Sequence, residues 1–185
     1  SGVGVIRGII ASAPTIDDIV ATPTGFLSTV LDANGNQTAT LVASGSNRRA
    51  VTIDEIPKNL QHAFVAIEDE RFYEHNGIDV TGIIRAGVKG VASGFHFSEG
   101  ASTITQQLLK NTVFTSWTSE SSMADKFERK FQEQYLALQL EKVVDKDWIL
   151  ENYLNAINLG QNTLGVGVAS ERYFGKDVSD LTLSE

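Results

Sequence analysis

The spacing of apolar residues from Lys58 onward is the feature that most limits what this chain can fold into. In six successive stretches, apolar side chains recur three or four residues apart, as they do on one face of a helix. They predict helices at residues 58–70, 80–93, from Ser102 or Thr103 to about 111, 124–142, 146–157 and 163–174. The longest of these, 124–142, carries its apolar stripe at Phe127, Phe131, Tyr135 and Leu138. The fold is therefore expected to be mainly α.

Residues 1–55 have a different pattern. Two β-prone runs flank Asn34-Gly35, and Asn-Gly between such runs is the strongest short signal for a β-hairpin. We expect a linker or pedestal segment with a β-hairpin at 1–55 and a helical domain at 56–185.

Size and composition exclude several classes of protein. A chain of 185 residues with 42% hydrophobic residues is long enough for one domain with a real core. Its net charge of −8 argues against a nucleic-acid partner. The absence of cysteine rules out disulfides and thiolate metal sites. No run reaches the roughly 18 apolar residues that a bilayer span requires, so the chain as given is expected to be soluble.

The stretch "EDERFYEHNGID" (68–79) holds five carboxylates and a histidine directly after the apolar run "AFVAI". A carboxylate at the end of an apolar helix face, here Glu68 with Phe72 one turn later, is placed as a general base should be. The alternative is a solvated helix end, with His75 closing it favourably at the negative end of the helix dipole. The histidines His62, His75 and His96 lack metal-ligand spacing, so no zinc site is expected.

Two further stretches collect polar groups at helical spacing. "EGASTITQQLLKN" (99–111) brings hydroxyls, amides and Lys110 to the start of a helix, a place that favours anions. In "ERKFQEQYLALQLEK" (128–142), Arg129 and Lys130 share a face with Glu133. Taken singly, the first is also compatible with an ordinary capped helix and the second with an exposed ion-pair ladder. A fourth stretch, "WILENYLNAINLGQNTLGVGVASERYFGK" (148–176), favours packing.

In this order, the four stretches resemble the peptidoglycan glycosyltransferase domain (glycosyltransferase family 51) of class A penicillin-binding proteins. The family patterns are E-D-x-x-F-x-x-H-x-G, G-G-S-T-I-T-Q-Q-x-x-K-N, R-K-x-x-E and I-L-E-x-Y-L-N. They are met here from Glu68 to Gly77, from Gly100 to Asn111 with Ala101 for the second glycine, from Arg129 to Glu133 and from Ile149 to Asn155. The resemblance covers about residues 50–185, and four ordered motifs together are very specific.

The resemblance implies a lysozyme-like α fold and a reaction that polymerises lipid II into glycan strands. A sugar 4-hydroxyl attacks the anomeric carbon of another sugar with inversion, and polyprenyl pyrophosphate leaves. The catalytic residues would be Glu68, as general base, and Glu133. Lys110, Arg129 and Lys130 would stabilise the leaving pyrophosphate. The substrate-binding residues would be Asp69, Ser102, Thr103, Gln107, Lys110, Asn111, Arg129 and Lys130.

The resemblance also implies partners and a location. The partners are lipid II and the nascent glycan, the membrane surface, moenomycin-type inhibitors and a transpeptidase domain in the full-length chain. The protein would act at the outer face of the cell membrane. No cofactor is required, although Glu133 could hold a divalent cation (Mg²⁺ or Mn²⁺) on the pyrophosphate. Because the family's domain continues into a further helix, we expect this sequence to be cut short at its C-terminal end.

Two features depart from the family pattern. The segment between the second and third motifs, residues 112–128, is longer than usual. We expect a mobile loop whose Trp117 contacts lipid, and the alternative is that Phe114 and Trp117 pack on the domain. The arginine that the family often has there is missing, and Lys126 is the nearest substitute. The alternatives to be separated are a lysozyme-like or lytic transglycosylase hydrolase and a wall-binding module without turnover.

Overall fold

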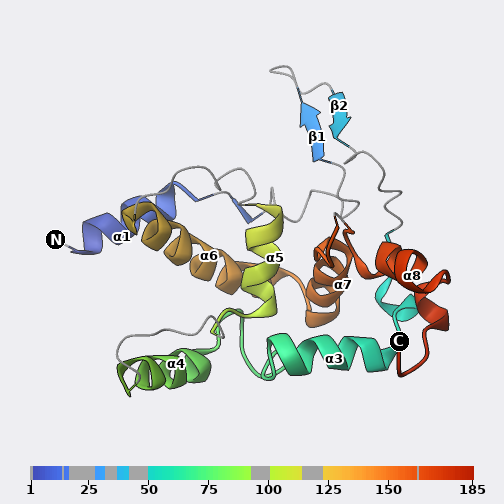
Figure 1. Cartoon of the computed structure of the whole chain (residues 1–185). Coiled ribbons are helices and arrows are strands. Elements are labelled where there is room, and N and C mark those ends of the chain that lie inside the picture. Colours follow the sequence, from blue (N-terminus) through green and yellow to red (C-terminus); the bar gives the residue numbers. More distant parts are fainter. Residues whose placement is uncertain are drawn as a thin grey trace.

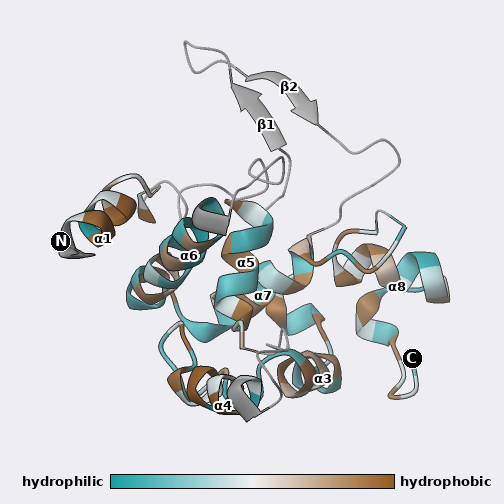
Figure 2. Cartoon of the chain, turned by 60° about the vertical axis from the view of Figure 1, so that its left-hand side comes forward, coloured by the Kyte–Doolittle hydropathy of each residue, from teal (hydrophilic) through white to brown (hydrophobic). Residues whose placement is uncertain are grey.

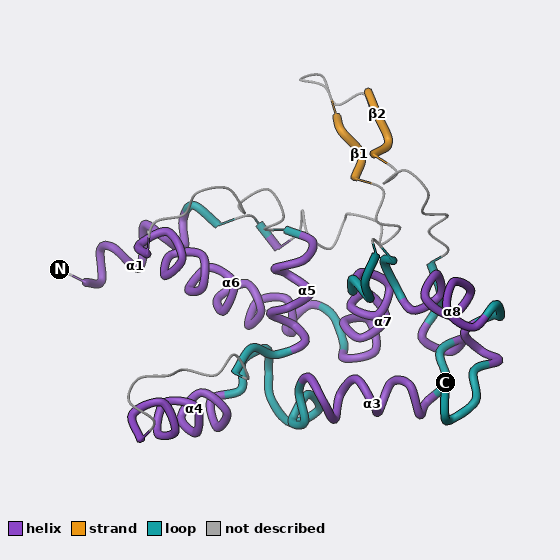
Figure 3. The backbone as a smooth tube through the Cα atoms, in the orientation of Figure 1, coloured by secondary structure: helices purple, strands orange, loops and turns teal. Residues whose placement is uncertain are grey.

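The computed structural model describes residues 2–13, 15–16, 28–31, 37–41, 50–92, 101–113, 123–161 and 163–185. Within them the chain is mainly helical, as predicted (Figure 3). The helices are α1 (Gly2–Ala11), α3 (Lys58–Glu68), α4 (Val80–Ala92), α5 (Ile104–Thr112), α6 (Met123–Val143), α7 (Lys146–Ala156) and α8 (Val166–Phe174). Short 3₁₀ helices, η1 and η3, lie at Ile53–Glu55 and Val178–Asp180. The six predicted helices therefore agree with the structure to within about three residues at nearly every end.

Two strands, β1 (Ser28–Leu31) and β2 (Gln37–Leu41), pair antiparallel with Ser28 opposite Leu41. They project from the helical body (Figure 1). The Asn34-Gly35 turn lies outside the described residues, so the hairpin turn stays a prediction. The domain boundary at residue 55 also stays a prediction, although the chain is already tied to α7 at Val51, whose N–H donates to Asn155 Oδ1 at 2.9 Å.

The core is built around α5, which packs against α6 and α7 (Figure 1). Many of the buried apolar side chains come from these three helices: Ile104, Leu108 and Leu109 from α5, Leu136 and Leu140 from α6, and Ile149, Leu150, Tyr153 and Leu154 from α7. Burying each of them contributes about 1.5–3 kcal/mol. Because α5 is held on two sides, the polar residues at its start have fixed positions.

The apolar stripe predicted for α6 is wrong at its two phenylalanines, although Tyr135 does pack against the core. Phe127 and Phe131 are 64% and 48% exposed, whereas Gln132 and Glu133 are buried beside Leu136. The reason is hydrogen bonding, since a buried polar group is tolerated when it is paired. Gln132 Nε2 donates to Ile9 O and Ser12 Oγ of the α1 segment at 3.0 and 2.9 Å. The contact holds α1, which the sequence did not predict, against α6.

Helix α4 turns apolar side chains to solvent. Much of α4 is coloured as hydrophobic in Figure 2. Val80, Ile84 and Val88, spaced one turn apart on one face, are 56%, 62% and 66% exposed, so this face is not part of the core. No helix within the described ranges is long and apolar enough to cross a bilayer.

The segment predicted as a loop at 112–128 is partly helical, because α6 begins at Met123. Residues 114–122, with Trp117 among them, lie outside the described part of the chain. The expected mobility of this loop and its contact with lipid therefore stay predictions.

An ion pair fixes the entry to α4. Arg71 Nε and Nη2 donate to Asp79 Oδ2 at 2.9 and 2.5 Å, and Asp79 Oδ1 accepts the Gly82 N–H at 2.9 Å. The hydrogen bond from Arg71 holds the pKa of the Asp79 carboxyl below its ordinary value. Glu70, which is exposed, bridges Arg71 and Arg85.

We expect Asp79→Asn to lower the melting temperature by a few degrees at pH 7 and to flatten its fall in acid. A carboxyl with a depressed folded pKa stabilises the protein above its unfolded pKa of about 3.9, and the contribution is lost as pH falls through the folded pKa. Melting curves between pH 2 and pH 7 measure this. Glu70→Gln is the control with the smaller effect, because its pairs are exposed. Equal curves for wild type and Asp79→Asn would contradict the prediction.

Candidate active site

Glu68 is the last residue of α3, and its side chain is exposed. Phe72, one turn later, does not shield it from water, because Phe72 is fully buried and packs against the rings of Tyr73 and His75. Phe72 instead anchors the turn after α3. The carboxylate of Glu68 accepts a hydrogen bond from Gln107 Nε2 at 3.2 Å.

Asp69 and Thr103 make structural contacts within the protein, and the substrate contacts predicted for them stay predictions. Asp69 Oδ2 accepts the Ile104 N–H at 2.9 Å and lies 2.7 Å from His75 Nε2. Thr103 is the N-cap of α5, and its hydroxyl donates to Gly77 O at 2.7 Å. Both side chains are buried, and together they join the first motif to the start of α5. A carboxylate at this end also matches the positive pole of the helix.

His75 and Gly77 form the turn that makes this junction. His75 Nδ1 accepts the Gly77 N–H at 3.0 Å, so the ring proton is on Nε2 and is donated to Asp69. Gly77 has φ +111°, and a Cβ there would lie 2.5 Å from Ala137 O on α6. These two residues therefore shape the turn.

The third motif, from Arg129 to Glu133, supplies an ion pair to the site. Lys130 Nζ lies 2.6 Å from Glu133 Oε1 and donates to Ser102 Oγ at 2.7 Å. Glu133 also accepts from Gln106 Nε2 at 3.2 Å and is 3% exposed. Gln106 was not among the predicted site residues. The feature of the sequence that could have indicated Gln106 is the pair of adjacent glutamines in the second motif. Gln107 donates to Glu68, and Gln106, next to it on α5, donates to Glu133.

A cleft of about 490 Å³ brings most of the predicted residues together. Its lining includes eight of the ten: Glu68, Ser102, Gln107, Lys110, Asn111, Arg129, Lys130 and Glu133. Lys126 completes the lining, in support of its reading as the substitute cation. Four cations thus face two carboxylates, which makes the cleft positive in a chain of net charge −8. Among the described residues, neither Lys110 nor Arg129 is paired with a carboxylate, and the Arg129–Glu133 pairing is not formed. These cations are available to an anionic ligand.

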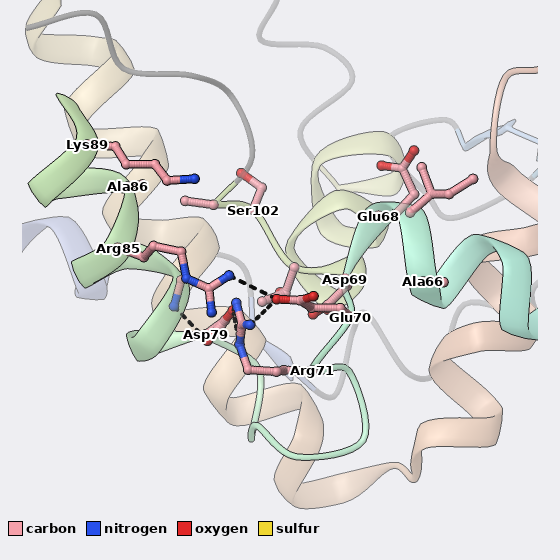
Figure 4. A pocket seen from close by; sticks show the side chains of 14 residues that line it. Ala66, Glu68, Asp69, Glu70, Arg71, Asp79, Arg85, Ala86, Lys89 and Ser102 are labelled. Atoms are coloured by element: carbon pink, nitrogen blue, oxygen red, sulfur yellow. Dashed lines mark hydrogen bonds and ion pairs between the residues drawn. The ribbon is translucent and has the colours of Figure 1, made fainter. Parts of the chain in front are cut away.

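A second pocket of about 260 Å³ shares Glu68 and Ser102 with the cleft. Figure 4 shows Glu68 at one side of it and Arg85 and Lys89 of α4 at the other. Glu68 therefore stands between two hollows, one lined by α5 and α6 and one lined by α4. In the described part of the chain, no group of three or more histidine or acidic side chains could hold a metal ion.

Comparison with known proteins identifies the class. The family model described as Transglycosylase matches residues 34–185. The chain therefore belongs to the transglycosylase family, the peptidoglycan glycosyltransferase family that its four motifs indicated.

The particular relatives are penicillin-binding proteins. The chain is 46% identical to Penicillin-binding protein 1A of Clostridium perfringens strain 13 over 183 residues, which is 97% of this chain and 26% of that protein. It is 44% identical to Penicillin-binding protein 1A of Clostridium novyi over 188 residues, covering 99% and 21%. It is 45% identical to Penicillin-binding protein 1F of Bacillus subtilis over 159 residues, covering 85% and 21%. The chain thus spans about a quarter or less of the length of these relatives.

Proposed function

We propose that this domain polymerises lipid II by inverting glycosyl transfer, with the lysozyme-like architecture that its family resemblance implies. The observation that carries the proposal is the pairing of one exposed carboxylate, Glu68, with a cluster of cations across a single cleft. A sugar hydroxyl is a weak nucleophile and needs a base. A pyrophosphate leaving group is stable as an anion and needs positive charge instead of a proton.

Glu68 is the general base of this proposal. Its carboxylate accepts the proton of the acceptor's 4-hydroxyl as that oxygen bonds to the anomeric carbon of the donor. The bond from that carbon to the pyrophosphate oxygen breaks, and polyprenyl pyrophosphate leaves with the electron pair. The exposure of Glu68 between two hollows supports the assignment, since the acceptor can enter from the α4 side and the donor can lie in the cleft.

The leaving group is bound by Lys110, Arg129 and Lys130, with Ser102, Gln107 and Asn111 as hydrogen-bonding partners. Charge-assisted hydrogen bonds to phosphate are about twice as strong as neutral ones. Glu133 acts indirectly, because its carboxylate is paired with the ammonium group of Lys130 and holds that group in position for the pyrophosphate. Lys126 adds a fourth cation at the rim of the same cleft.

We expect a chelator to lower the polymerisation rate by less than about tenfold, because the protein supplies the charges that meet the pyrophosphate. Within the cleft Glu133 is the carboxylate that could share a Mg²⁺ or Mn²⁺ with the substrate, and it is already paired with Lys130. A divalent ion would thus be held mainly by phosphate oxygens. The rate is measured with EDTA and after Mg²⁺ is returned. Complete loss that Mg²⁺ restores would contradict a metal-independent site.

Incubation with lipid II separates this function from its rivals. Long glycan strands and free polyprenyl pyrophosphate are the expected products. Cleavage of preformed glycan would favour a lysozyme-like hydrolase, and binding without product would favour a wall-binding module. The cation cluster favours the transferase, because a hydrolase of glycan has no pyrophosphate to stabilise.

The lipid-linked substrate places the domain at the outer face of the cell membrane, next to a transpeptidase domain in the whole protein. The exposed apolar face of α4, formed by Val80, Ile84 and Val88, supports a membrane surface as partner. The pocket at Glu68 is lined by a different face of α4, at Gly82, Arg85, Ala86 and Lys89.

Lys110→Ala and Arg129→Ala are expected to weaken binding of moenomycin-type phosphoglycolipids, which resemble the donor. A hydrogen bond to a charged group contributes about 1.5–3 kcal/mol, so each change should raise Kd by roughly tenfold to a hundredfold. Titration calorimetry measures this, with Lys89→Ala, on the other side of Glu68, as the control that keeps its affinity. Unchanged affinity in both cleft variants would refute the phosphate role.

A further inference from the structure

The side chain of Tyr153, on α7, is completely buried directly behind the site. Its ring packs edge-on against Phe64 of α3, with 6.2 Å between centroids. Its hydroxyl donates to Gln107 Oε1 at 3.2 Å. Tyr153 therefore joins the fixed core to the amide that contacts Glu68, although it does not line the cleft itself.

The direction of these hydrogen bonds settles how the amide of Gln107 is oriented. The carboxylate of Glu68 can only accept hydrogen bonds, so the group of Gln107 that faces it is the NH₂ group. Burial and the nearby charge of Glu68 raise the pKa of the Tyr153 phenol far above its ordinary value, so the hydroxyl keeps its proton and can donate it to the amide oxygen. The amide oxygen of Gln107 must face that donor, and its NH₂ group must then face Glu68. A flipped amide would point an oxygen at the carboxylate and leave the phenol facing an NH₂ group.

The consequence appears at the carboxylate. Gln107 Nε2 donates a hydrogen bond to Glu68 Oε2 at 3.2 Å. In the part of the chain that the structure describes, Glu68 Oε1 makes no hydrogen bond. One oxygen is thus held by the protein, and the other is left for the proton of a substrate hydroxyl.

We infer that Tyr153 is a positioning residue that acts through Gln107 to fix the orientation of the Glu68 carboxylate. The inference rests on the proposed function, since it assigns a task to the base of that reaction. It also explains why a tyrosine stands at a core position where a phenylalanine would fill nearly the same space.

Tyr153→Phe is the test, because it keeps the ring and removes only the hydroxyl. We expect kcat for lipid II polymerisation to fall about threefold to tenfold, the effect of losing one hydrogen bond of ordinary strength. We expect KM to stay within about twofold, because Tyr153 does not touch substrate. Tyr73→Phe, at an exposed tyrosine beside Phe72, is the matched control and should keep both constants.

A double-mutant cycle separates positioning from general packing. If Tyr153 acts through Gln107, then Tyr153→Phe should have no further effect on kcat in a Gln107→Ala background. Losses that multiply would overturn the inference, and so would a Tyr153→Phe variant with wild-type kcat.

Side-chain amide signals of Gln107 in NMR give a readout that needs no turnover. They should shift in Tyr153→Phe and remain in place in Tyr73→Phe. Unchanged signals would overturn the inference while leaving the proposed function intact. A wild-type protein that makes no glycan from lipid II would instead overturn the proposed function.

Discussion

Glu68→Gln is expected to reduce polymerisation of lipid II by about a thousandfold, within the range that a general base contributes. The amide cannot take the proton of the acceptor hydroxyl, although its oxygen can still accept the hydrogen bond from Gln107. Because Glu68 is exposed at the end of α3, we expect the free energy of unfolding to change by less than about 0.5 kcal/mol. Radiolabelled lipid II and a melting curve measure the two quantities.

Glu74→Gln is the matched control for that experiment. Glu74 is another exposed carboxylate of the first motif, and it lies outside both the cleft and the neighbouring pocket. It should keep wild-type activity. Turnover by Glu68→Gln within a few fold of wild type would remove Glu68 from the role of base.

Gly77→Ala is expected to destabilise the fold by about 2–4 kcal/mol, since it adds backbone strain to a steric clash. The backbone of Gly77 lies at φ +111°, and the new Cβ would meet Ala137 O and the Leu138 N of α6 within 3 Å. The turn cannot move aside easily, because Gly77 is bonded to both His75 and Thr103. For a protein of this size the melting temperature should fall by roughly 5–15 °C.

Gly87→Ala provides the opposite expectation from the same chemical change. Gly87 lies inside α4 with no atom near the position of its Cβ, so alanine should stabilise the helix by about 0.5–1 kcal/mol. A Gly77→Ala variant that melts at the temperature of wild type would contradict the first expectation, because the turn at Gly77 would then tolerate a Cβ next to α6.

Helices were predictable because their signals are local. The N-cap Thr103 with Gln106 three residues later, and Asp145 before α7, mark helix starts by their own side chains. Gly175, in the left-handed conformation, marks the end of α8 in the same way. Such signals depend on residues within one turn of each other, which a sequence displays directly.

The faces of the helices were less predictable. An apolar period indicates that a stripe exists, but not whether it meets the core, a membrane or another chain. Phe131 of α6 and Val88 of α4 were assigned to stripes by their period and are exposed. Gln132 and Glu133 are buried because they are hydrogen-bonded, by Ile9, Ser12 and Gln106 on other elements and by Lys130 one turn earlier on α6 itself.

By itself, the sequence determined the mainly helical class, the helix positions and, through four ordered motifs, the family. The same motifs predict the base and the cations of the site. Only the tertiary structure decided which motif residues reach the cleft. It turned Asp69 and Thr103 inward to hold the start of α5, and it brought Gln106, Lys126 and Tyr153 to or behind the site. The physical reason is distance along the chain: a capping bond joins neighbours three residues apart, whereas Tyr153 and Gln107 are 46 residues apart and meet only because α5 and α7 pack together.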